Sequence, residues 1–151
     1  MEKENQIQTF NFAPKGLVGD IRDAIRNRFY ININYTNKYV PYSFVGYRNI
    51  APAVLGINKI SGNLVLRAFL IRGISYSIQE NISKNQWRLF LVNRISNWSV
   101  SSNVFGPLPL YRFNDKSLRD IREQLNFEEQ METFNENNES FNEEDYDWFE
   151  I

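Results

Sequence analysis

The feature that most constrains the fold is a series of short segments, within residues 29–104, in which apolar and polar residues alternate. In the first of them Ile31, Ile33 and Tyr35 share one parity, which is typical of a strand with one buried face. Pro52 places the second strand at a sheet edge or a bulge, because proline cannot donate a ladder hydrogen bond. The sequence predicts strands at residues 29–35, 47–59, 64–71, 87–95 and 98–104.

Apolar residues at helical spacing flank these strands and predict helices over residues 15–29 and 116–125, the second capped by Asn114 or Asp115. The inward positions are Leu17, Ile21, Ile25 and Phe29 in the first helix and Leu118, Ile121 and Leu125 in the second. Closing a small sheet removes its exposed edges. We therefore expect a mainly β (α+β) fold, in which a small closed five-stranded barrel is flanked by an N-terminal and a C-terminal helix.

Charge divides the chain into a basic body and an acidic tail. All 17 Lys and Arg residues lie within residues 3–122, and only 8 of the 18 Asp and Glu residues precede residue 128. Residues 1–127 thus carry a formal charge of +9 and residues 128–151 a charge of −10. The expected organisation is a polar arm over residues 1–14, a barrel domain over residues 15–127, and a largely disordered acidic tail over residues 128–151.

Composition excludes several classes of function. The sequence has no Cys and no His, which removes disulfides, thiolate metal sites and every histidine-based catalytic arrangement. The carboxylates of the body show no motif spacing, and there is no Gly-rich phosphate loop. We therefore expect a protein that is not an enzyme and that uses no cofactor and no metal. No apolar run approaches a bilayer span, and the N-terminal residues lack the apolar core of a signal peptide, so a cytoplasmic location is expected.

Three separated segments resemble the WYL domain family, in the family's order. Residues 47–52 (YRNIAP) resemble its R-x-I-x-P strand, residues 62–69 (GNLVLRAF) resemble the segment that holds the Trp-Tyr-Leu triplet, and residues 88–95 (RLFLVNRI) resemble its R-x-F-x-L-D-R-I signature. The sequence departs from the family at the triplet, which reads Leu64-Val65-Leu66, at Asn93 in place of the signature Asp, and in lacking a His found in many members. The match covers residues 33–95.

The resemblance implies a stand-alone WYL module of the phage or mobile-element type, because only about 28 residues precede the predicted barrel. It also implies that the five-stranded barrel is Sm-like and that it carries a basic ligand surface, with Arg48, Arg88 and Arg94 at the family's arginine positions. Arg67 lies in the second matching segment. If Leu89 and Leu91 point inward, Arg88 and Arg94 point outward beside Phe90. The alternative for these arginines is a solvated surface pair, or salt bridges to Asp115 or Glu123. Tyr47 beside Arg48 is the best candidate for stacking on a base.

The acidic tail carries regularly spaced aromatic residues. Phe127, Phe134, Phe141 and Trp148 follow one another at seven-residue intervals, and Phe149 follows Trp148. Acidic groups with spaced aromatic rings imitate phosphates with bases, so the tail is expected either to compete for the body's binding groove or to recruit a protein partner through Phe134, Phe141, Trp148 and Phe149. The alternative is an inert solubilising tail.

The sequence therefore predicts a non-enzymatic module that binds nucleic acid, single-stranded DNA or RNA. One alternative is a ligand-sensing or protein-interaction module that regulates a phage or host complex. Another is a structural phage protein that assembles into oligomers. No membrane partner is expected, and a phage-encoded chain would act in the host cytoplasm.

Overall fold

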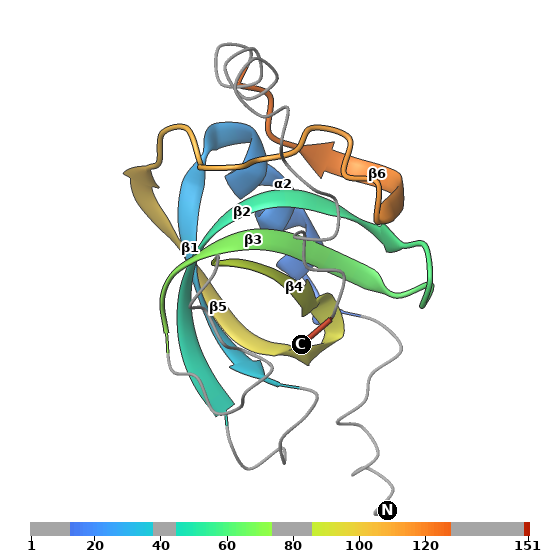
Figure 1. Ribbon diagram of the computed structural model, residues 1–151. Helices are drawn as coiled ribbons and strands as arrows, with labels where there is room; N and C mark the ends of the chain where they lie inside the picture. Colours follow the sequence, from blue (N-terminus) through green and yellow to red (C-terminus); the bar gives the residue numbers. More distant parts are fainter. Residues whose placement is uncertain (1–12, 38–44, 74–85, 128–149) are drawn as a thin grey trace, which may run out of the picture.

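A strongly curved antiparallel sheet of six strands packs against one α-helix (Figure 1). The computed structural model describes residues 13–37, 45–73, 86–127 and 150–151. The elements of the described residues, in chain order, are helix α2 (Leu17–Asn27), strands β1 (Phe29–Thr36), β2 (Val45–Asn58), β3 (Leu64–Gly73) and β4 (Trp87–Leu91), the short 3₁₀ helix η2 (Val92–Arg94), and strands β5 (Ile95–Val104) and β6 (Leu118–Gln124). Within the described residues, no helix is long and apolar enough to cross a bilayer.

The expected closed five-stranded barrel is wrong, because the sheet is open. Its strand order is β4-β3-β2-β1-β5, and β6 pairs with β2 outside this path. Strand β2 is long enough to pair along one edge first with β1, over Val45–Ile50, and then with β6, over Val54–Asn58. In the described part of the chain no ladder joins β4 to β5. Residues predicted as one strand, 87–95, instead turn through η2, so the chain leaves β4 before it joins β1 as β5.

The predicted C-terminal helix is also wrong, because these residues form β6. Between the pairs Ile57↔Arg119 and Leu55↔Glu123, β6 advances by more residues than β2 does, and Asp120 has a φ of +49°. Such a bulge shifts the inward-facing parity of a strand. Leu118 and Ile121 consequently both pack on the core although they are three residues apart in a strand. In the sequence, this spacing is the one expected of a helix.

Other predicted elements are confirmed. Helix α2 buries Leu17, Ile21 and Ile25 as the spacing indicated, and it packs on β1, β2, β5 and β6. It ends at Asn27, so Phe29, predicted as its last inward position, instead begins β1 and is half-buried. Ile31, Ile33 and Tyr35 of β1 are buried as the alternation indicated. The β2–β3 register shifts between Pro52 and Val54, so Pro52 lies at a bulge, where its missing donor is tolerated.

An ion pair joins the exposed face of α2 to β6 and predicts a pH dependence. Arg26 Nη2 lies 2.9 Å from Glu123 Oε1, and Arg22 lies 3.4 Å from the same oxygen. Hydrogen bonding from Arg26 lowers the pKa of Glu123 below its ordinary value of 4.5. A lowered folded-state pKa stabilises the fold above the unfolded pKa, and this contribution is lost as the pH falls through the folded value.

Replacing Glu123 with glutamine should therefore lower the free energy of unfolding at pH 7 and lower it less at pH 3, because protonation of wild-type Glu123 progressively removes the ion pair as the pH falls. Urea denaturation at the two pH values measures this difference, which is small because the pair is solvated. An equal loss at both pH values would show that the glutamine disturbs packing rather than charge.

Candidate functional site

Most of the arginines predicted to contact nucleic acid lie in the interior. Arg48 and Arg67 are fully buried, Arg88 is 2% exposed, and Phe90 is fully buried. All five residues of β4 are buried, so the outward orientation expected for Arg88 and Phe90 is not observed. Arg94 is half-buried, and its guanidinium donates to the Thr36 carbonyl oxygen at 3.4 Å.

The Arg67 guanidinium belongs to a buried polar network. Its Nε lies 3.0 Å from Asp115 Oδ2, and its Nη2 donates to Ser117 Oγ at 3.2 Å. Ser117 donates to Asp115 Oδ1 through both its hydroxyl and its backbone N–H. Asp115 was proposed as a helix cap or as a partner of Arg88 or Arg94, yet the structure pairs it with Arg67. Because the Arg67 and Asp115 side chains are both fully buried, Arg67 has a structural role in this network.

The buried Arg48 side chain lies near Tyr35 of β1 and Gly73 at the end of β3. Its guanidinium carbon is 5.8 Å from the centre of the buried Tyr35 ring, within cation–π distance. A Cβ at Gly73, the residue opposite Arg48, would lie 2.7 Å from Arg48 Cδ and 2.8 Å from the Tyr47 carbonyl oxygen. Glycine at this position therefore lets β3 approach the backbone that carries Tyr47 and Arg48.

The outer face of β2, β1 and β5 is polar, and the strand register aligns its side chains in two rows. Tyr47, Asn34 and Asn97 are opposite one another in the first row. Arg72, Asn49, Asn32 and Ser99 are opposite one another in the second row. We call these seven residues the amide face. Tyr47 is 40% exposed, and Arg72, Asn97 and Ser99 are exposed as well.

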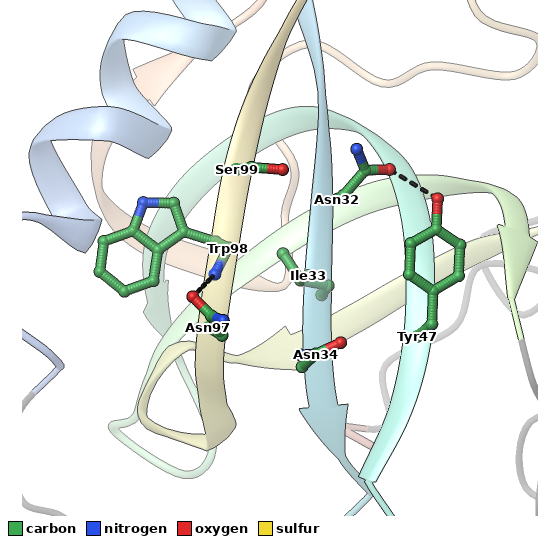
Figure 2. Close-up of a pocket in the computed structure, with 7 residues that line it drawn as sticks. All are labelled: Asn32, Ile33, Asn34, Tyr47, Asn97, Trp98 and Ser99. Atoms are coloured by element: carbon green, nitrogen blue, oxygen red, sulfur yellow. Dashed lines mark hydrogen bonds between the residues drawn. The ribbon is translucent and has the colours of Figure 1, made fainter.

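Part of the amide face forms a shallow pocket of about 260 Å³ (Figure 2). Its lining comes from β1, β2 and β5: Asn32, Ile33, Asn34, Tyr47, Asn97, Trp98 and Ser99. Ile33 is buried beneath it. The lining therefore offers amide donors and acceptors, a hydroxyl and one exposed aromatic ring on a rigid sheet.

Hydrogen bonds within the amide face orient the Asn32 side chain. Its Oδ1 accepts from the Tyr47 hydroxyl at 2.7 Å and from Asn49 Nδ2 at 2.7 Å. Figure 2 shows Asn32 Nδ2 on the side of the amide away from Tyr47. The same bond holds the Tyr47 ring at one rim of the pocket, so part of the ordering cost of binding is met in the free protein.

Trp98 lies on the other side of the pocket and serves mainly to join β5 to α2. Its Nε1 donates to Asp20 Oδ2 at 2.9 Å, and its ring extends from β5 away from Tyr47 (Figure 2). The Trp98 backbone N–H donates to Asn97 Oδ1 at 2.9 Å, which orients the Asn97 amide. Tyr47 is therefore the ring of this pocket that is free to stack on a ligand.

The sequence interpretation identified Tyr47 but missed the asparagines. The alternation that places Ile31 and Ile33 inward also places Asn32 and Asn34 outward, so the signal was present in the polar half of the same pattern. The pairing of Asn49 and Arg72 with Asn32 needs the strand register, which one sequence does not reveal. Among the described residues, no group of three Asp or Glu side chains is placed to hold a metal ion.

Comparison with known proteins bears on the fold. No family model matches the sequence, and no curated protein matches it. The structure is similar to that of proteasome accessory factor B/C (PafBC) of Arthrobacter aurescens, with a TM-score of 0.50 and 18% sequence identity. The likeness covers 70% of this chain and 15% of PafBC, so this chain corresponds to a small part of that protein.

The likeness supports a WYL-like fold. This supports the sequence resemblance at the level of the fold, and at 18% identity it extends no further. Of the three arginines at the family's positions, Arg48 and Arg88 are interior and Arg94 is half-buried. The exposed polar residues that the described sheet offers instead include those of the amide face. The tail residues Phe134, Phe141, Trp148 and Phe149 lie outside the described residues.

Proposed function

We propose that this chain is a non-enzymatic regulatory module that binds single-stranded DNA or RNA across the amide face. The observation that carries the proposal is the alignment of Tyr47, Asn34 and Asn97 beside the row that begins at Arg72. Unstacked bases bind proteins by stacking on aromatic rings and by hydrogen bonds to their edges. An amide offers both a donor and an acceptor, and an exposed arginine at the end of the row can contact a phosphate.

Charge and shape favour an extended polyanion over a small molecule. Residues 1–127 carry a formal charge of +9, which attracts a nucleic-acid backbone over the whole body. The pocket, at about 260 Å³, is shallow and lies within a longer polar surface. In this proposal the acidic tail, including Phe134, Phe141, Trp148 and Phe149, competes for the amide face or recruits a protein partner.

Replacing Tyr47 with alanine should weaken binding of a 12-nucleotide single strand by about 5- to 150-fold, the equivalent of ~1–3 kcal/mol for one stacked base. Fluorescence anisotropy with DNA and RNA oligonucleotides at low salt measures the affinity. Phe113→Ala is the matched control, because Phe113 is also 40% exposed and lies outside the amide face. Arg72→Ala should reduce the magnitude of the slope of log affinity against log salt by about one, the contribution of a single phosphate contact.

Two results would contradict the proposal. One is a full chain that binds neither oligonucleotide at low salt. The other is equal loss of affinity in Tyr47→Ala and Phe113→Ala, which would place the contact elsewhere. Competition by a mononucleotide as strong as that by the oligonucleotide would instead favour a small-ligand sensor.

A further inference from the structure

The edge of β4 and the β2–β3 turn hold two residues of the tail. Ile151 donates its backbone N–H to the Leu89 carbonyl oxygen at 3.0 Å, and Glu150 forms a parallel bridge with Leu89. Ile151 is fully buried and Glu150 is 5% exposed. Figure 1 shows this short segment, marked C, close to β4. Two residues so distant in sequence from β4 thus lie against it as a short added strand.

The Glu150 carboxylate is held by three donors from the β2–β3 turn. Asn58 Nδ2 donates to Oε2 at 2.9 Å, Asn63 Nδ2 donates to Oε1 at 3.1 Å, and the Ser61 hydroxyl donates to Oε2. A carboxylate accepts from all three, whereas a glutamine would turn its amide nitrogen toward a donor. The turn therefore selects glutamate over its neutral isostere.

The donors are oriented by the turn itself. Asn58 Oδ1 accepts from the Ile60 backbone N–H at 2.8 Å, which directs its Nδ2 outward to Glu150. Ser61 Oγ accepts from the Asn63 N–H at 3.1 Å, which leaves its proton for the carboxylate. Gly62, with a φ of +79°, lets the turn close onto the Asn58 carbonyl oxygen at 2.8 Å. None of these bonds involves Glu150, so residues 58–63 form the receptor without it.

From this arrangement we infer that the β2–β3 turn and the β4 edge form a peptide-binding site. Its ligand class is an extended segment in which a glutamate is followed by a bulky aliphatic residue. In this chain the site is occupied in cis by its own Glu150-Ile151. This site is distinct from the amide face: β4 is one edge strand of the sheet and β5 is the other, and the inference stands whether or not the chain binds nucleic acid.

The test uses a full-length variant whose own residues 150–151 no longer occupy the site, and it supplies the ligand as a separate peptide. The double variant Glu150→Lys/Ile151→Asp removes the carboxylate and places a charge where the buried aliphatic group lay. A fluorescein-labelled peptide of residues 143–151 should bind this variant tighter than it binds the wild-type chain by about ten-fold or more, because the tethered segment no longer competes at high effective concentration. A peptide with glutamine in place of Glu150 should bind the vacated variant more weakly.

Matched variants assign the binding to this site. Adding Asn63→Ala, at an exposed position of the turn, should abolish the gain, and circular dichroism checks that the fold remains. Glu144→Gln with the docked pair intact changes the net charge of the tail by the same +1 as the double variant, and it should bind the peptide as weakly as wild type does. Equal peptide binding by wild type and the vacated variant would overturn the inference. A wild-type dimer in solution that the double variant dissociates would also overturn it, because the occupant would then be a second copy.

Discussion

The variant Asp115→Ala is expected to lose about 3–5 kcal/mol of unfolding free energy, because it removes the carboxylate from a buried ion pair. Both the Arg67 and Asp115 side chains are fully buried, and Asp115 also accepts both bonds donated by Ser117. Without this carboxylate, a buried guanidinium and a buried hydroxyl lose their strongest acceptor. The free energy of unfolding of a small domain is about 5–15 kcal/mol in total, so this variant is expected to lose a large fraction of it. Urea denaturation at pH 7 measures the change.

Asp23→Ala is the control for removing a carboxylate from the surface. Asp23 is 67% exposed and pairs with Arg26 at 3.4 Å, so its loss should cost below about 0.5 kcal/mol. The pair Arg67→Met/Asp115→Leu should be less destabilised than Asp115→Ala, since it leaves no lone buried charge. If Asp115→Ala unfolds no more easily than Asp23→Ala, the network does not stabilise the fold.

Tyr35→Ala is expected to be similarly damaging, at about 3–5 kcal/mol for a fully buried aromatic residue. Tyr35 lies on β1 and packs edge-to-face on Phe90 of β4, with 4.9 Å between ring centres. Its hydroxyl accepts from the Leu91 N–H at 2.9 Å. Strands β1 and β4 are not neighbours in the sheet, so this side chain joins them across the curved interior.

The variant Tyr35→Phe separates the ring from the hydroxyl, and should cost about 0.5–1.5 kcal/mol for the lost hydrogen bond. Tyr47→Ala provides the surface comparison, because Tyr47 is 40% exposed on the same sheet. We expect Tyr47→Ala to change oligonucleotide binding with little change in stability. Thermal and urea unfolding give the order of stability of the three variants. A Tyr35→Ala protein as stable as Tyr47→Ala would contradict the role of Tyr35 in joining β1 to β4.

Local patterns predicted local structure well where the chain is regular. The four-residue spacing in α2 and the alternation in β1 identified both elements and their buried faces, because each depends on one element burying one face. The same reasoning failed at β6, where the bulge at Asp120 changes the period from two to three. Sheet closure could not be derived either, because it depends on whether the edges of β4 and β5 meet after η2.

For the candidate site, the sequence by itself determined the charge division, the outward Tyr47 and the alternating asparagines of β1. Tertiary structure alone decided the rest. The pairing of distant strands aligned Arg72 and Asn49 with Asn32, buried Arg48, Arg67 and Arg88, and brought Glu150 to Asn58. Residue type specifies what a group can bind, whereas strand register and curvature decide which groups meet and which remain accessible. For this chain, strand register and curvature placed Arg48, Arg67 and Arg88 in the interior and left exposed the amide face, the surface that we propose for binding.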